Sequence, residues 1–289
     1  MSLSLSSPSG SVSESLAAYQ AEREILLRSL QSAAESDARI AAVWLFGSLG
    51  RKDEDELSDI DIVFVVQNAH LKAVIAERYT FMKRIGDLIL VEEAPQNAPP
   101  GGAYNMAVYA APVSPHTVDC YWQPVEGTCV PPQSLLLFDR VGLPVTSTAR
   151  VFGYQPVPET SPVEAVNRSI QFFWVMILIT AKYVGRSPFE ERMGLLQWVF
   201  APLADCERFV SETPAFTLET APAHAEPLAK TRLLRDLIAR MDTLTPLLSG
   251  RGAETAPAMP ANTRRYLDFI ESVAAVRPRP ADPAEPARG

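Results

Sequence analysis

Two apolar segments joined by a polar connector constrain this chain more than any other feature. Residues 40–46 and 59–66 are short, almost wholly apolar and flanked by polar residues, so both predict buried strands. The second segment begins with Asp59 and Asp61, which are one residue apart and therefore point to the same face of a strand. Two like charges beside an apolar run repel each other and resist burial, and a divalent cation relieves both penalties. Carboxylate oxygens suit Mg²⁺, so the pair predicts a magnesium site.

A Gly-Ser turn ends the first of these segments. Gly47 allows the backbone to come close to a ligand, and Ser48 adds a hydroxyl and an N–H. If a helix begins there, its free N–H groups and the positive end of its dipole favour a phosphate. The alternative is an ordinary turn followed by a strand entered through solvated aspartates. The presence of both motifs in strand context favours a phosphate site beside a metal site.

The order of these motifs resembles the signature of the DNA polymerase beta-type nucleotidyltransferase superfamily: apolar-Gly-Ser, a spacer, then Asp-apolar-Asp-apolar. The resemblance implies that Gly47 and Ser48 hold the β- and γ-phosphates of a nucleoside triphosphate, normally ATP. It also implies that Asp59 and Asp61 hold Mg²⁺, within a small mixed sheet that carries flanking helices.

Three further segments, at 93–104, 137–142 and 172–183, look like the antibiotic branch of that superfamily, the lincosamide and aminoglycoside nucleotidyltransferases. Members of that branch use magnesium to transfer AMP from ATP to a drug hydroxyl, and a helical C-terminal domain closes their cleft. The resemblance covers roughly residues 35–250 and is most specific at 47–61. It does not identify the acceptor, because no drug-specific pocket is recognisable.

Nucleotidyl transfer also needs a group that takes the proton of the acceptor hydroxyl or completes a second metal site. Asp119 is a lone acid in the β-prone segment 116–122, where the resembling superfamily carries its third carboxylate. We expect it on a strand beside Asp59 and Asp61, with all three carboxyl groups within one coordination sphere. The alternative is a solvent-facing strand residue. Asp87 and His116 are weaker candidates for the base, and His116 follows a proline, which is typical of a turn.

Two basic residues are candidates for the triphosphate. Arg51 lies close after the Gly-Ser turn, and the charged residues that follow it predict a solvated connector. Lys182 ends an apolar helical run, where a basic residue of the C-terminal domain often reaches the triphosphate in the resembling superfamily; a snorkelling lysine is the alternative. Trp174, Tyr183 and Trp198 could stack on a ring, but their helical spacing favours the core.

The fold class expected is α+β, with a mixed-sheet domain and then an all-helical domain. Strands are expected at 40–46, 59–66, 86–92, 104–111, 117–122 and 135–139, and helices at 13–35, 69–84, 162–184, 188–212, 226–248 and 262–276. A proline-rich stretch near residue 155 predicts a linker. We therefore expect a catalytic domain over 1–155, of which 1–11 is disordered, a helical domain over 156–276, and a disordered tail over 277–289.

The composition narrows the partners. The chain of 289 residues has a net charge of −8 and a pI near 5.1, which provides no electrostatic footprint for a polynucleotide and suits a small cationic or polar acceptor. Cys120, Cys129 and Cys206 lack metal-site spacing and are odd in number, which favours a reducing cytoplasm. We find neither a signal peptide nor an apolar run of bilayer length, so no membrane partner is expected.

The function expected from these features is magnesium-dependent transfer of a nucleoside monophosphate, AMP from ATP, to a hydroxyl of a small molecule. Two alternatives stay open: modification of tRNA or protein by a toxin-like enzyme, and a nucleotide-binding sensor that does not catalyse. The acidic pI counts against tRNA, and the intact trio of carboxylates counts against the sensor. The sequence does not indicate the oligomeric state.

Overall fold

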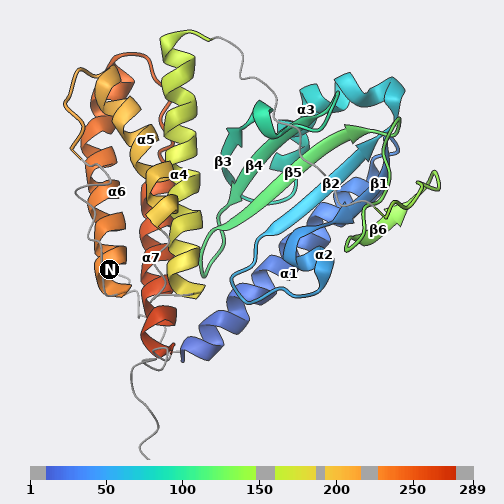
Figure 1. The fold of residues 1–289 in the computed structure, drawn as a ribbon, viewed down its shortest axis with the longest axis horizontal. Helices are drawn as coiled ribbons and strands as arrows, with labels where there is room; N and C mark the ends of the chain where they lie inside the picture. The colour runs from blue at the N-terminus through green and yellow to red at the C-terminus, as the bar shows by residue number, and fades with distance from the viewer. Residues whose placement is uncertain (1–10, 148–159, 187–192, 216–226, 278–289) are drawn as a thin grey trace, which may run out of the picture.

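A six-stranded mixed sheet lies beside a group of long helices in the computed structural model, which describes residues 11–147, 160–186, 193–215 and 227–277 (Figure 1). The strands are β1 (Ile40–Leu45), β2 (Ile60–Val66), β3 (Leu88–Glu93), β4 (Ala103–Tyr109), β5 (His116–Pro124) and β6 (Leu135–Asp139). Their order across the sheet is β3-β4-β5-β2-β1-β6. Only β2 and β5 pair in parallel among these neighbours. This pairing brings two segments far apart in the chain side by side at the centre of the sheet.

The described helices are α1 (Val12–Ser36), α2 (Gly47–Arg51), α3 (Leu71–Lys83), α4 (Pro162–Arg186), α5 (Met193–Phe209), α6 (Pro227–Gly250) and α7 (Met259–Val276). Two single 3-10 turns, η1 (Asn68–His70) and η2 (Pro95–Asn97), precede α3 and β4. The expected α+β class is confirmed, with the sheet and its flanking helices first and the long helices after it.

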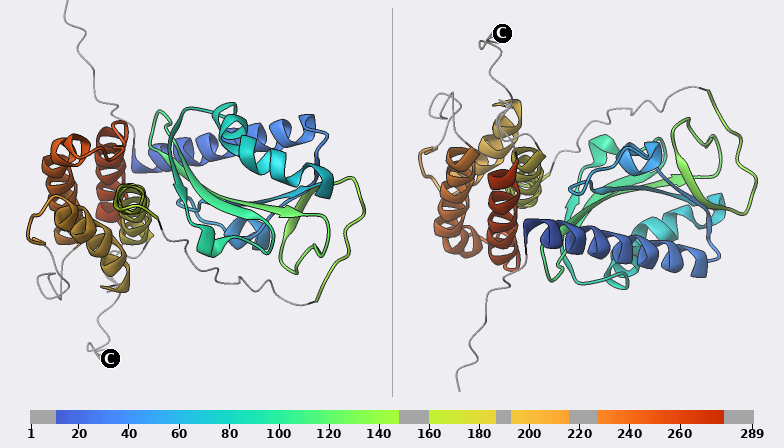
Figure 2. Two further views of the ribbon diagram at one scale, coloured as in Figure 1. Left: turned by 90° about the horizontal axis from the view of Figure 1, so that it is seen from above. Right: turned by 90° about the horizontal axis from the view of Figure 1, so that it is seen from below.

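Helices α1 and α3 cover one face of the sheet (Figure 2). A capping box at Ser11 and Glu14 begins α1, which satisfies backbone donors at the helix start. Buried residues then recur at helical spacing along α1, among them Leu26 and Leu30, and pack on the sheet. Because β2 is buried on both faces, it carries an unbroken apolar run after its aspartate, as a central strand requires.

The other face of the sheet meets the long helices. One continuous apolar cluster includes Val63 and Tyr121 from the sheet and Phe173, Leu237 and Ile270 from α4, α6 and α7. The two parts of the chain therefore share a core. The domain boundary expected near residue 155 lies outside the described residues and stays a prediction, as do the disordered ends expected at 1–11 and 277–289, of which only residues 11 and 277 are described.

Helix α4 is the single described helix whose length and composition would allow it to cross a membrane. Half of the window that meets this criterion is buried inside the structure, and α4 packs against α5 and α7. A core helix meets the same criterion, so the feature is explained by the position of α4 among its neighbours.

Several expected boundaries move by a few residues. Strand β2 begins at Ile60, so Asp59 precedes it, and β4 ends at Tyr109. His116 is the first residue of β5 and pairs with Tyr109, so its expected place in a turn is wrong. The ladder between β4 and β5 outweighs the local effect of the preceding proline.

Candidate active site

Asp61 and Asp119 are directly paired residues on the parallel strands β2 and β5. Cross-strand partners point to the same face of a sheet, here the face that meets the long helices. Asp119 is buried, with 8% of its surface exposed, and Asp61 is half-buried. The chain thus places two carboxylates side by side at the centre of the sheet, as expected for Asp119 from the sequence.

Burial and mutual repulsion disfavour the charged forms of these two groups. Burial raises the pKa of Asp61 to about 8, and the neighbouring charges of Asp119 and Asp59 add to the rise. Burial and the charge of Asp59 raise the pKa of Asp119 to about 7, although a hydrogen bond from Tyr104 and the charge of Lys182 oppose the rise. A positive charge placed at this point would therefore be strongly favoured.

Asp59 is held by a lysine from the helical part. The Lys182 Nζ on α4 lies 2.5 Å from the Asp59 Oδ2, and Lys182 is only 6% exposed. The ammonium therefore reaches the carboxylates themselves. It is not a snorkelling helix-end lysine, and its sequence-predicted role at a triphosphate stays a prediction.

Gly47 is required by the backbone and by the space at the site. It begins α2 with a φ of +62°, in the left-handed region that favours glycine. A Cβ at this position would lie 1.9 Å from the Asp61 Oδ2. The Gly-Ser turn and the aspartate pair are thus in contact, and Ser48 follows as a half-buried residue of α2.

Arg51 ends α2 with its guanidinium Nε 2.9 Å from the Asp53 Oδ2, and its side chain is 43% exposed. The hydrogen bond to Asp53 raises the pKa of Arg51, and the charges of Asp53 and Asp61 contribute to the rise. The charge of Asp61 in the site therefore acts on Arg51, but the Arg51 side chain is in contact with Asp53.

The connector after Arg51 is exposed at Lys52, Asp53 and Glu54, as the sequence predicts, but it is anchored from Asp55 onward. The Arg186 guanidinium on α4 donates to both carboxylate oxygens of Asp55, at 2.7 and 2.8 Å. The Arg23 guanidinium donates to the backbone oxygens of Asp55 and Ser58 at 2.8 and 2.9 Å. An ion pair with α4 and hydrogen bonds from α1, which local composition does not reveal, hold this part of the connector in place.

The weaker candidates for a base lie apart from the carboxylates. Asp87 is exposed before β3. His116 is buried, stacks on Tyr19 with ring centroids 4.2 Å apart, and has its Nε2 3.4 Å from Glu22. Burial lowers the pKa of His116. The positions of Asp87 and His116 therefore leave Asp119 as the favoured candidate for the base.

Of the aromatic candidates, Trp174 is a core residue with 2% of its surface exposed. Tyr183 is half-buried, and Trp198 is 56% exposed. The expected core position is therefore correct for Trp174 and wrong for Trp198, since helical spacing alone does not tell which turns of α5 face a neighbour.

Two residues that the sequence did not single out belong to the same face. The Tyr104 hydroxyl on β4 donates to the Asp119 Oδ1. Glu92 on β3 is 5% exposed, and its pKa is raised to about 8 by burial and then by the charge of Asp119. The sequence signal that could have identified Glu92 is its spacing: it is two residues after Leu90, so an acid lies on the same face of the strand as an apolar residue.

The expected convergence of all three aspartates on one metal position is not met. Among the residues that the structure describes, no group of three or more His, Cys, Asp and Glu side chains is arranged to hold a metal ion. Each carboxylate instead has its own neighbour: Lys182 at Asp59, Gly47 at Asp61 and Tyr104 at Asp119. Buried neighbouring carboxylates, in which the charge of Asp119 raises the pKa of Asp61, nevertheless fit a hard divalent cation, which needs only one or two protein carboxylates.

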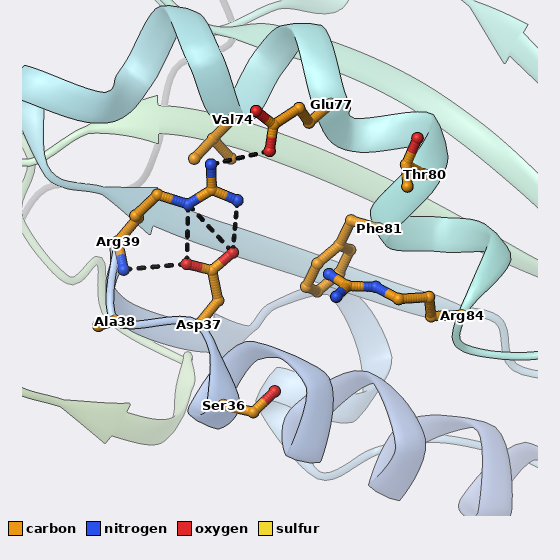
Figure 3. A pocket seen from close by; sticks show the side chains of 9 residues that line it. All are labelled: Ser36, Asp37, Ala38, Arg39, Val74, Glu77, Thr80, Phe81 and Arg84. Carbon is orange, nitrogen blue, oxygen red and sulfur yellow. Dashed lines mark hydrogen bonds and ion pairs between the residues drawn. The ribbon is translucent and has the colours of Figure 1, made fainter.

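A cleft of about 240 Å³ lies elsewhere, between the α1–β1 turn and α3 (Figure 3). Its Arg39 guanidinium is already paired with Asp37 and Glu77, each at 2.8 Å. Figure 3 shows Arg84 beside Phe81 at the other end of this cleft. The lining of this cleft includes none of the residues of the carboxylate site, so the cleft does not form part of that site.

Comparison with known proteins identifies the class. Residues 28–97 match the family model described as polymerase beta, nucleotidyltransferase. This segment contains Gly47, Ser48, Asp59 and Asp61 and ends before Asp119. The chain therefore contains a nucleotidyltransferase-type domain. Its polymerase beta-type domain covers the Gly-Ser turn and the aspartate pair, so the superfamily resemblance found in the sequence is confirmed.

One solved structure found to be similar is that of a proposed nucleotidyltransferase from Sulfolobus solfataricus. The two chains are 19% identical, with 48% of this chain and 98% of that chain covered, and the TM-score is 0.26. The search of curated proteins found no match.

Proposed function

We propose that this protein transfers AMP from ATP to a hydroxyl of a small cationic molecule of the aminoglycoside or lincosamide kind, with magnesium as the metal. The observation that carries the proposal is the direct pairing of Asp61 with Asp119 on β2 and β5, with Asp59 one residue before β2. A sheet that held these charges only for stability would gain nothing from their repulsion.

Asp59 and Asp61 are the proposed metal ligands, and Asp119 either completes the metal site or accepts the proton of the attacking hydroxyl. Mg²⁺, when bound, supplies positive charge that stabilises the phosphoryl oxygens and the leaving pyrophosphate. Burial and the charge of Asp59 raise the pKa of Asp119, which favours its acting as a proton acceptor, and the Tyr104 hydroxyl orients the Asp119 carboxylate.

The nucleotide is proposed to lie at the start of α2, where Gly47 permits close approach and Ser48 offers its N–H and hydroxyl. Arg51 and Lys182 are the proposed cations for the triphosphate. The position of Lys182 supports this role. Its ammonium lies at Asp59, and a metal bound to Asp59 would compete with the ammonium and free it for the triphosphate.

The acceptor is proposed to be small rather than a polynucleotide, and the protein to act in the cytoplasm. A net charge of −8 leaves few free cations for a chain of phosphates, whereas magnesium screens a triphosphate locally. An acidic protein instead attracts a cationic acceptor.

Incubation with labelled ATP, Mg²⁺ and a panel of aminoglycosides, lincosamides and tRNA tests the proposal by mass spectrometry. We expect one AMP added to a drug, and no transfer by the Asp119→Asn variant. Labelled tRNA together with unmodified drugs would assign the enzyme to the macromolecular alternative. Binding of ATP without transfer to any acceptor, equal in the wild type and Asp119→Asn, would instead favour the sensor.

A further inference from the structure

A single buried carboxylate on β3 has no partner within the described part of the chain. Glu92 is 5% exposed, and no hydrogen bond or ion pair is formed by its side chain there. Its neighbour Glu93, on the opposite face of the strand, is paired with Arg78 at 2.5 Å. The contrast is informative because the same strand satisfies one glutamate completely and leaves the next without a cation.

Glu92 lies in line with the proposed catalytic carboxylates. It pairs with Met106 on β4, Met106 pairs with Asp119 on β5, and Asp119 pairs with Asp61 on β2. These residues share one face of the sheet. Since neighbouring strands are about 4.8 Å apart, the Glu92 Cα lies roughly 10 Å from that of Asp119.

Aromatic side chains occupy the same face close to this row. The rings of Tyr104 and Tyr121 have centroids 4.7 Å apart, and Phe46 meets Tyr121 at 5.1 Å. Aromatic faces attract cations and pack against sugar rings. Helix α4 packs against β3, the strand that carries Glu92.

Among the residues that the structure describes, no basic side chain neutralises Glu92. Burial raises its pKa, and the charges of Asp119 and Glu93 raise it further, with no basic residue opposing them. Lys182, the cation nearest to the aspartates, is bound by Asp59. A buried carboxylate without a partner is costly, and a cationic ligand group removes that cost.

Building on the proposed function, we propose that Glu92 binds an ammonium or guanidinium group of the acceptor and so determines its specificity for cationic molecules. The acceptor then lies along β5 and β4, with its reacting hydroxyl at Asp119 and its charged group at Glu92. Glu92 is not the base, because a base must be within hydrogen-bond reach of the reacting hydroxyl, and Asp119 occupies that position.

Calorimetric binding of two matched probes tests this role. Kanamycin A is a cationic saccharide, and raffinose is an uncharged saccharide of similar size. Binding is measured with the wild type, with Glu92→Gln, which keeps the shape of the side chain, and with Glu93→Gln as the matched control. Each protein is measured without nucleotide and with Mg²⁺ and a non-hydrolysable ATP analogue.

We expect Glu92→Gln to weaken kanamycin A binding by about tenfold or more, the value of a charge-assisted hydrogen bond. Binding of raffinose and of the ATP analogue should not change, and Glu93→Gln should bind kanamycin A as the wild type does. Equal weakening by both variants, or no preference of the wild type for kanamycin A over raffinose, would overturn the assignment. Glu92-dependent binding without AMP transfer would refute the proposed function alone.

Discussion

Removal of the Lys182 ammonium should show how strongly the helical part is bound to the aspartates. Lys182→Met keeps most of the apolar stem and removes the charge, which leaves Asp59 without its partner at 2.5 Å. Breaking a buried ion pair from one side costs about 3–5 kcal/mol, and the 19% exposure of the Asp59 side chain reduces this to about 2–4 kcal/mol. At about 2–4 °C per kcal/mol for a protein of this size, we expect Tm to fall by roughly 5–15 °C.

A double-mutant cycle separates the ion pair from other effects of the substitution. Asp59→Asn alone should cost less, because Asp61 and Asp119 still attract the lysine. The double variant should be more stable than the two single losses predict, by a coupling energy of about 1–3 kcal/mol. Lys83→Met, at an exposed position on α3, removes the same charge and should leave Tm within about 2 °C.

Urea unfolding at neutral pH measures the four corners of this cycle, and added Mg²⁺ provides a second readout. Magnesium should raise the Tm of Lys182→Met more than that of the wild type, since in the wild type it competes with the ammonium for Asp59. A coupling energy within about 0.5 kcal/mol of zero would show that the contact carries no energy.

Three further substitutions test the site. Gly47→Ala should abolish transfer and lower the free energy of unfolding by about 1–3 kcal/mol, because the new Cβ would meet Asp61. Gly101→Ala is the control: Gly101 also has a positive φ, but a Cβ there would have no atom within 4 Å, so this variant should keep full activity. An active Gly47→Ala enzyme would contradict the contact. Glu92 has a folded-state pKa of about 8 against an ordinary 4.5, so the folded state binds the extra proton and wild-type stability is lost as pH rises from 4.5 to 8. Glu92→Gln should lack this loss and exceed the wild type by up to about 4 kcal/mol at pH 8, with Glu93→Gln as control, and parallel curves for Glu92→Gln and the wild type would refute the burial argument. Asp61→Asn should lower turnover by about a hundredfold or more without lowering Tm at pH 8, where about half of the wild-type Asp61 carboxyl groups are charged and repel their neighbours. Retained turnover would place the metal site elsewhere.

Local pattern predicted the central strands and the aspartates well. The apolar run of β2 is long and uninterrupted, and a lone acid in the β-prone segment around Asp119 has few structural explanations. Both signals depend only on residues near each other in the chain. Helix and strand types were therefore predictable, whereas ends such as Ile60 and Tyr109 depend on pairing and were not.

The contacts that join distant segments could not be predicted. Lys182 reaches Asp59 only because α4 packs over the sheet, and nothing near either residue encodes that distance. Glu92 faces the site because the β3–β4 pairing shifts register between Leu88 and Leu90, which sets the face of every later residue in the strand. A shift of one residue would have placed Glu93 there instead.

The two cations of α4 link the sheet and the helices mechanically. Lys182 and Arg186 are one helical turn apart, and they hold Asp59 and Asp55 at the two ends of one short connector. A ligand that draws Lys182 away from Asp59 leaves Arg186 as the one cation of this pair that still holds the connector to α4. Because such linkage is reciprocal, a molecule that binds the outer helices and displaces α4 would change nucleotide affinity without touching the sheet.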